Sequence, residues 1–420
     1  MNKVTGLSKK VKRQSKASVL SKASSVVGID IGKENLSCAL MDIKETMKCR
    51  FSVEASLAGY QAMLARVRAE ARGKVVFALE PTGHYWMVLG QFFEDHNQAY
   101  VLVHPLVVAR SREVERLNRG KTDRLDASLI AKLACRGEVT RTQIPEHYWA
   151  TIRFFAREFM DREKDVAREK NRITSYLETT LPGFLEIFPC PLSGTGRACL
   201  RVLANFKEAV RADFVSFENT VRACFTGKRL LTSRVRLLHD TLRHDHVLGL
   251  RSGRSAMFFR ITNVLDRLEL YERQKHAAEQ SLLAAYSQTE FKQYFDSIWG
   301  TTSTVNALAL AFIGDPTSYD TPKALVKLAG SDPVVNESGK FRGRTFISHR
   351  GRSLLRKAGD RIAFLLEKRN AIFRTFHQRL MRRSKNRLTK RQARVACINK
   401  YLRIIWVLCN HRVPFNPALA

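Results

Sequence analysis

Four acidic residues in the first third of the chain have the types and positions of a metal site. Asp30 lies inside the apolar run VVGIDIG, where an unpaired charge would be costly. Glu80 ends a second apolar run, VVFALE, at the carboxyl edge where α/β folds place their sites. Asp123 and Asp126 of KTDRLDA are spaced i and i+3, so a helix would carry both on one face. We predict these four residues as catalytic and metal-binding, with Mg²⁺ or Mn²⁺ as cofactor, because hard cations prefer carboxylate oxygens and can stabilise a phosphodiester under attack.

The Asp123/Asp126 pair also has a purely structural explanation. An aspartate at a helix start is an ordinary N-cap, and an acid three residues later resembles a capping box. The catalytic interpretation of this pair therefore depends on its company with Asp30 and Glu80.

A serine in the last third, Ser338 in ESGKFRGR, could attack a phosphate. The glycine after it gives a permissive backbone, and the basic residues of KFRGR could hold the phosphate. No histidine base lies beside it in the sequence, so its hydroxyl would need activation by a metal. On local evidence alone, a surface hairpin with a basic face is the stronger interpretation, and Ser331 and Ser348 are competing serines.

The charge balance indicates a nucleic acid partner. Lys and Arg number 72 against 39 Asp and Glu, a formal charge of +33, which self-repels unless a polyanion is present. The basic residues are spread along the chain, and no apolar run approaches the ~18 residues of a membrane span, so we expect no membrane partner. The C-terminal tract RLMRRSKNRLTKRQAR would track phosphates. The nucleic-acid-binding candidates are Lys121, Lys340, Arg342, Arg344 and Arg350.

The acidic residues require a sheet that positions them. After a basic arm over residues 1–25, VVGIDIG predicts a strand, and the alternating segments LSCALMD and MKCRFSV predict its hairpin partners. Further along, the pattern predicts helices over residues 57–71, 84–96 and 123–136, and strands over residues 74–79 and 100–105. Alternating strands and helices predict an α/β domain over residues 26–144, with a largely parallel sheet after an antiparallel start.

Beyond residue 145 the patterns are helical. Residues 148–181 and 256–287 predict long charged helices, which favour a helical hairpin or coiled-coil insertion over residues 145–291. Between them LPGFLEIFPCPLSGTG is typical of a loop, and its GTG lacks the strand before and the helix after that a nucleotide-binding loop needs. Residues 292–420 predict a mainly α-helical C-terminal domain that carries the serine. The 8 scattered cysteines favour reduced thiols in a cytosolic protein and disfavour structural zinc.

The segments GIDIGKE, ALEPTGHY and KTDRLDA together resemble the IS110-family transposases, also called bridge-RNA-guided recombinases. The C-terminal run FIGDPTSYDTPKALVKLAGSDPVVNESGKFRGR resembles the second characteristic region of that family. The likeness covers residues 26–136 and 292–412, and two separated motif groups in the right order make it specific.

The resemblance implies a RuvC-like N-terminal domain with an RNase H fold, whose Mg²⁺-binding DEDD quartet maps onto Asp30, Glu80, Asp123 and Asp126. It also implies a C-terminal catalytic serine, mapped onto Ser338, that forms a covalent phosphoserine link to DNA. In the family, a composite site assembles between subunits and dimers pair into tetramers. A structured RNA selects the donor and target DNA. For this chain we expect the same partners, in the cytoplasm of a bacterium and associated with its nucleoid.

Two positions depart from the family pattern. A second glycine usually follows the serine motif, and this chain has Lys340 there. The family's loop Gly-x-Gly-x-x-Thr-Ala has lost its second glycine in residues 300–304, GTTST.

Three functions are compatible with these features. The leading hypothesis is a site-specific DNA recombinase that cleaves and rejoins strands under RNA guidance. The second is a RuvC-like nuclease or junction resolvase that hydrolyses DNA with the quartet alone, which Ser338→Ala would distinguish. The third is a non-catalytic basic scaffold for nucleic acid, for which Asp30→Asn would change nothing.

Overall fold

The protein forms two compact units, residues 1–145 and 146–420, in the computed structural model. The structure describes residues 20, 23–81, 85–115, 123–139, 147–243, 249–250, 252–334, 337–338, 341–342 and 346–419. At Asp123, Ser338 and Arg342 it describes the backbone but not the side chain. The predicted arm over residues 1–25 lies almost wholly outside the described residues.

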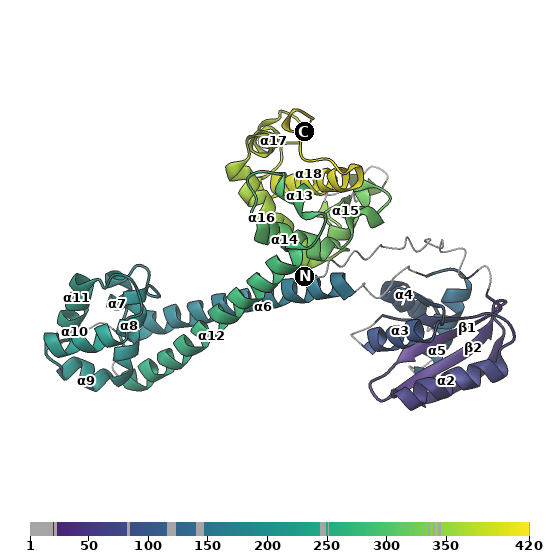
Figure 1. Ribbon diagram of the computed structural model, residues 1–420, viewed down its shortest axis with the longest axis horizontal. Helices are drawn as coiled ribbons and strands as arrows, with labels where there is room; N and C mark the ends of the chain where they lie inside the picture. Colours follow the sequence, from purple (N-terminus) through teal and green to yellow (C-terminus); the bar gives the residue numbers. More distant parts are fainter. Residues whose placement is uncertain are drawn as a thin grey trace, which may run out of the picture. The chain divides into compact units, whose positions relative to one another are not determined.

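A five-stranded mixed sheet is the centre of the first unit (Figure 1). Its order is β3-β2-β1-β4-β5, formed by Met47–Glu54, Asn35–Asp42, Ser25–Ile31, Val75–Leu79 and Tyr100–Leu102. The first three strands pair antiparallel, whereas β1, β4 and β5 run parallel. The predicted α/β sheet with an antiparallel start is therefore confirmed.

Helices cover both faces of this sheet. On one face α2 (Leu57–Glu70) and α3 (Tyr85–Asp95) pack against Val27 and Phe77. On the other, α4 (Pro105–Glu115) and α5 (Asp123–Cys135) pack against Val26 and Ala78. Adjacent residues of a strand serve opposite faces because side chains alternate along it. The sequence did not predict α4, whose few apolar residues are followed by a run of charges.

Two antiparallel helices, α6 (His147–Thr180) and α12 (Arg254–Ser287), form the long hairpin of the second unit (Figure 1). The Tyr148 hydroxyl donates to the Ala285 carbonyl near one end, and Arg267 pairs with Glu169 further along. The buried positions of α6 are residues 152, 156, 159, 160, 166, 169, 173, 177 and 180, and most successive ones are three or four residues apart. The predicted helical pair is thus present, and its description as a coiled coil stays a prediction.

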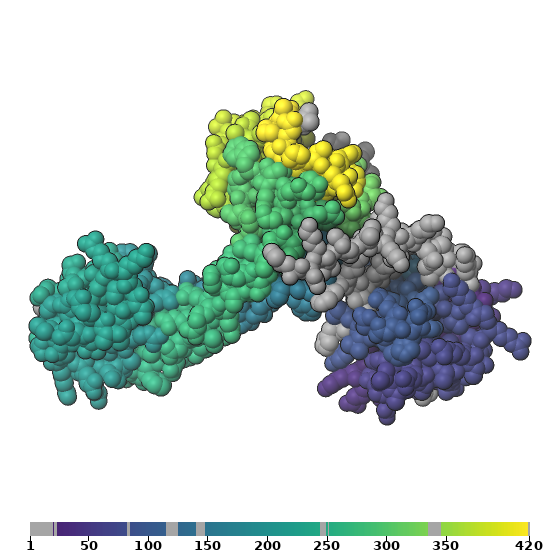
Figure 2. Space-filling view, in the orientation of Figure 1, coloured from purple at the N-terminus to yellow at the C-terminus, as the bar shows by residue number. Residues whose placement is uncertain are grey.

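The far end of the hairpin carries a small helical body, which Figure 2 shows in teal. It contains α7 (Gly183–Ile187), α8 (Gly194–Val202), η1 (Leu203–Asn205), α9 (Phe206–Arg211), α10 (Phe214–Ala223) and α11 (Thr232–Arg243). The predicted loop over residues 181–196 is wrong in part, because it holds α7 and the start of α8. The Ser193 side chain accepts a hydrogen bond from the Gly196 amide and so caps α8. The GTG segment is the start of helix α8, and among the described residues no strand precedes it.

The C-terminal helices pack around α14 (Ser303–Ile313), in which every residue from Val305 onward is buried. The other members are α13 (Lys292–Asp296), η2 (Pro316–Ser318), α15 (Pro322–Ala329), α16 (Ser353–Arg369), α17 (Ala371–Arg382), α18 (Lys390–His411) and η3 (Pro417–Leu419). Short strands join α15 to α16. They are β6 (Pro333–Val334), β7 (Glu337–Ser338), β8 (Phe341–Arg342) and β9 (Phe346–Ile347). Within the described part of the chain, no helix combines the length and apolar character of a membrane span.

Candidate active site

Parallel pairing brings Asp30 and Glu80 to one edge of the sheet. In the register of β1 and β4, Ile29 lies opposite Leu79. Asp30 follows Ile29 and Glu80 follows Leu79, so the two acids come directly after the last paired residues, at the carboxyl ends of two adjacent strands. Asp30 is half-buried and Glu80 is buried, at 6% exposure. This edge is where α/β folds place ligands.

A glycine on β1 brings the third acid to this edge. A Cβ at Gly28 would lie 2.2 Å from the Ala127 carbonyl oxygen and 2.4 Å from the Ala131 amide nitrogen. Helix α5 therefore packs directly on the backbone of β1. A residue larger than Gly28 would not allow this close approach. Asp126, the neighbour of Ala127, is consequently buried at 4% exposure beside the strand ends.

Arg112 of α4 joins two of the acids. Its Nε donates to Asp126 Oδ1 at 2.9 Å, and its Nη2 donates to Glu80 Oε2 at 3.4 Å. The Glu80 and Asp126 side chains are 7% and 6% exposed, whereas the Arg112 side chain is 25% exposed. One guanidinium therefore supplies positive charge to two buried carboxylates.

The environment of Glu80 favours its neutral form. Burial raises the pKa of the Glu80 carboxyl above its ordinary value, and the charges of Asp30 and Asp126 raise it further. Arg112 opposes these effects and lowers the pKa, but the net direction is upward.

The chemistry of these side chains fits a hard divalent cation. Carboxylate oxygens are its preferred ligands, and the Arg112 guanidinium already lies against two of them as a positive group. In the described ranges, however, no group of three or more His, Cys, Asp or Glu side chains is close enough to hold a metal ion. The fourth predicted ligand, Asp123, begins α5 by its backbone, and its side chain lies outside the described residues.

Ser338 lies in a small antiparallel hairpin of the second unit. It pairs with Phe341, and Glu337 pairs with Arg342. A second pair, Pro333 with Ile347 and Val334 with Phe346, encloses this one in the sequence. The hairpin that the local pattern favoured is therefore present. The side chain of Ser338 lies outside the described residues, as do Lys121, Lys340, Arg344 and the side chain of Arg342.

The two competing serines have defined partners. Ser331 is buried at 1% exposure, and its hydroxyl donates to Asn399 Oδ1 at 2.6 Å. Asn399 in turn donates from Nδ2 to the Ser331 carbonyl at 3.0 Å, so this serine is held in the protein interior. Ser348 is half-buried and donates to Asp332 Oδ1. Burial makes Ser331 a poor nucleophile for a DNA phosphate.

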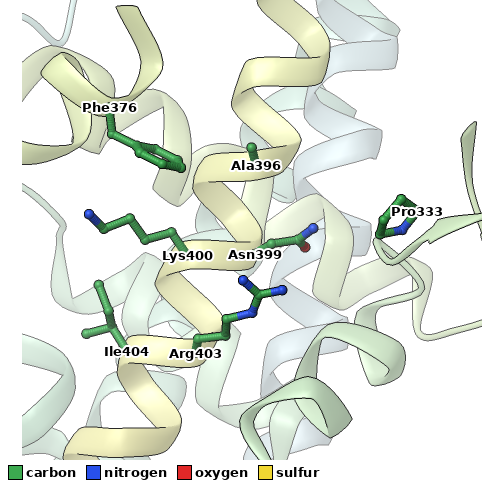
Figure 3. Close-up of a pocket in the computed structure, with 7 residues that line it drawn as sticks. All are labelled: Pro333, Phe376, Ala396, Asn399, Lys400, Arg403 and Ile404. Carbon is green, nitrogen blue, oxygen red and sulfur yellow. The ribbon is translucent and has the colours of Figure 1, made fainter. Parts of the chain in front are cut away.

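A hollow with two basic residues in its lining lies between helices α17 and α18 and strand β6. Lys400, Arg403 and Ile404 project from α18, between Phe376 of α17 and Pro333 of β6 (Figure 3). Burial lowers the pKa of the Lys400 ammonium, and the charge of Arg379 lowers it further. Arg350, the described member of the nucleic-acid-binding candidates, is exposed beyond β9. The sequence did not single out Lys400 and Arg403, because their approach to β6 depends on the fold.

Comparison with known protein families covers both units. A transposase model for the IS110-type DEDD domain matches residues 27–182. A second model, the transposase of the IS116/IS110/IS902 family, matches residues 292–378. The chain belongs to the IS110 family of transposases. This transposase is also 22% identical over 335 residues to the candidate transposase of the mini-circle IS117 from Streptomyces coelicolor, with 77% of this chain and 80% of that protein covered.

Family membership explains the first unit. The DEDD domain implies an RNase H-like fold, which agrees with the mixed sheet and its helices on both faces. It also implies a divalent metal cofactor and a DNA substrate. The transposase is therefore a DNA-transposing enzyme whose acidic edge is the candidate site of its chemistry.

Proposed function

We propose that this transposase is a site-specific recombinase of an insertion sequence, which cleaves and rejoins DNA strands through a covalent link between Ser338 and DNA. Asp30, Glu80, Asp123 and Asp126 would hold Mg²⁺. The observation that carries the proposal is that Asp30 and Glu80 end adjacent strands and that Arg112 joins Glu80 to Asp126, in a chain that matches both transposase family models.

The proposed reaction conserves the number of phosphodiester bonds. The Ser338 hydroxyl oxygen forms a bond to phosphorus, and the bond from phosphorus to a deoxyribose oxygen breaks. The serine proton leaves, and the released sugar oxygen takes up a proton. A sugar hydroxyl of the new partner strand then attacks the phosphoserine, which restores the serine. Because the bond energy is kept in the phosphoserine, no nucleotide hydrolysis is needed, in keeping with a chain that contains no G-x-x-x-x-G-K-[ST] motif.

The acidic side chains would act by holding charge next to the reacting phosphate. When bound, Mg²⁺ would supply Lewis-acid stabilisation of the phosphate oxygens. Glu80 and Asp126 are nearly buried, so the surrounding protein holds their carboxylates in place. Asp30 would add a third carboxylate from the adjacent strand.

The second unit would bind the nucleic acid. The basic residues that follow Ser338, Lys340, Arg342 and Arg344, would hold the phosphate that the serine attacks. Arg350, Lys400 and Arg403 of this unit, and Lys121 of the first unit, would contact further phosphates. A structured guide RNA would select donor and target DNA, and two dimers would form the complete assembly. The formal charge of +33 supports polyanionic partners of this size.

The Ser338→Ala variant tests the proposed nucleophile. We expect it to lose both strand exchange and the covalent protein–DNA adduct, which denaturing electrophoresis of labelled DNA detects. Ser331→Ala is the matched control, because it removes a buried hydroxyl from the same region. It should retain the adduct.

Two outcomes would contradict this assignment. An adduct of normal yield in Ser338→Ala would move the nucleophile elsewhere, with Ser348 beside Asp332 as the next residue to test. Metal-dependent DNA cutting without any adduct in the unaltered protein would instead favour a RuvC-like nuclease. The RNA that copurifies with the protein tests the guide, since altering its sequence should redirect insertion.

A further inference from the structure

The cation that joins Glu80 and Asp126 comes from the chain itself. Arg112 lies 32 residues after Glu80 and 14 before Asp126, on a helix that precedes α5. Its guanidinium donates one hydrogen bond to each acid, at 3.4 Å and 2.9 Å. Both acids are buried below 8% exposure, and Asp30 adds a further negative charge near Glu80.

Two ionised carboxylates that are buried beside one guanidinium need its positive charge. Two anions removed from water repel each other and lose their hydration, which destabilises the fold unless a cation lies between them. Arg112 meets this need when no metal is bound. A divalent cation on the same oxygens would meet it as well, at a metal–oxygen distance near 2.1 Å.

A metal ion on Asp126 Oδ1 and Glu80 Oε2 would compete with the Arg112 guanidinium, which contacts the same two oxygens. A cation bound to Glu80 and Asp126 would lie within a few ångströms of Arg112, and like charges at that distance repel. Arg112 has somewhere to go, since its side chain is already 25% exposed. On these two oxygens, metal binding and the Arg112 contacts would therefore be alternatives.

We propose that Arg112 is an internal substitute for the metal, which holds the acids together in the metal-free transposase and leaves them when a divalent cation binds. This inference rests on the proposed metal-binding role of Glu80 and Asp126. Arg112 thereby sets the metal concentration at which the site fills. It also offsets the repulsion between the acids before metal and DNA bind.

Replacing Arg112 distinguishes a residue that substitutes for the metal from one that only positions the two acids. In the full-length protein freed of metal with a chelator, titration calorimetry with Mn²⁺ should show that Arg112→Met binds the ion about tenfold more tightly than the unaltered protein. The reason is that no charged hydrogen bonds must be broken first. Arg112→Lys, which keeps the charge but not the fork of donors, should lie between the two. Arg50→Met is the matched control, because Arg50 donates from Nε to Ser128 of the same helix α5 at 3.0 Å and should leave the affinity unchanged.

Thermal unfolding gives a second readout that does not depend on activity. Without metal, Arg112→Met should unfold at a lower temperature than the unaltered protein. Mn²⁺ should raise the unfolding temperature of the variant by more than it raises that of the unaltered protein. If the variant is folded only with Mn²⁺ present, that rescue itself supports the proposal.

The outcomes that overturn the inference are distinct from those that overturn the metal site. Equal or weaker Mn²⁺ binding by Arg112→Met, or a loss of folding that Mn²⁺ does not restore, would show that Arg112 positions the acids and does not replace the metal. Absence of Mn²⁺ binding in both proteins would overturn the metal-binding role together with the inference.

Discussion

The close approach of α5 to β1 makes Gly28→Ala the sharpest test of how the acidic edge is built. The added Cβ would lie 2.2 Å from the Ala127 carbonyl oxygen and 2.4 Å from the Ala131 amide nitrogen. Non-bonded heavy atoms rest about 3.5 Å apart, so α5 must move outward by about 1 Å. Both contacts are backbone atoms, so no side-chain rotation can relieve them.

This displacement has two measurable consequences. Overpacking of this kind costs about 1–3 kcal/mol of unfolding free energy. Asp126 moves with α5, and metal ligands tolerate distance errors of only about 0.2 Å, so Mn²⁺ affinity should fall by about tenfold or more. Urea unfolding measures the first effect, and calorimetric titration of the chelator-treated protein measures the second.

Gly137→Ala is the matched control at the other end of the same helix. Gly137 has a φ of 75°, and a Cβ there would meet nothing within 4 Å. Alanine at this left-handed position should cost about 1–2 kcal/mol, a loss similar to that of Gly28→Ala. It should nevertheless leave Mn²⁺ affinity unchanged. Unaltered affinity in Gly28→Ala, or an equal loss in Gly137→Ala, would refute the view that Gly28 sets the position of Asp126.

Two further variants probe other contacts. Burial raises the pKa of Glu80, so stability that is present below the ordinary glutamate pKa is lost as the pH rises through the raised value. Glu80→Gln in the metal-free protein should therefore be more stable than the unaltered protein at neutral pH and should lack this pH dependence. A variant with the same pH profile would assign the effect to another group. Ser331→Ala removes the donor to Asn399 Oδ1 and should cost about 1–2 kcal/mol in urea unfolding. A change below ~0.3 kcal/mol would show that water replaces the contact.

The strands of the sheet and its antiparallel start follow closely from local sequence. VVGIDIG and KVVFAL are apolar on both sides, as strands covered on both faces must be, and the two alternating segments between them form the outer antiparallel pair. The long helices α6 and α12 also follow from periodicity, because most of their successive buried positions are three or four residues apart. Local patterns failed at α4 and α7, where a few apolar residues gain their helical form by packing on neighbours that are distant in the sequence.

Asp30 and Glu80 could be chosen from the sequence, since each is a charge in or at the end of an apolar strand, whereas the choice of Asp123 and Asp126 depended on those two. Residue types and spacing could not reveal which of them would meet. The sequence did not distinguish Arg112 from the other Lys and Arg residues, which number 72 in all. Its role depends on contacts from helix α4 to Glu80 and Asp126, which only the fold creates.

The sequence by itself determined the α/β character of the first unit, the long helical pair, the membership in the IS110 family and the identity of the acids proposed to bind metal. Only the tertiary structure decided that α5 lies on the bare backbone of Gly28, and that Glu80 and Asp126 share the guanidinium of Arg112. The physical reason is that periodicity and composition report the preferences of each segment for burial or solvent. The distance between side chains on different segments depends on how those segments pack.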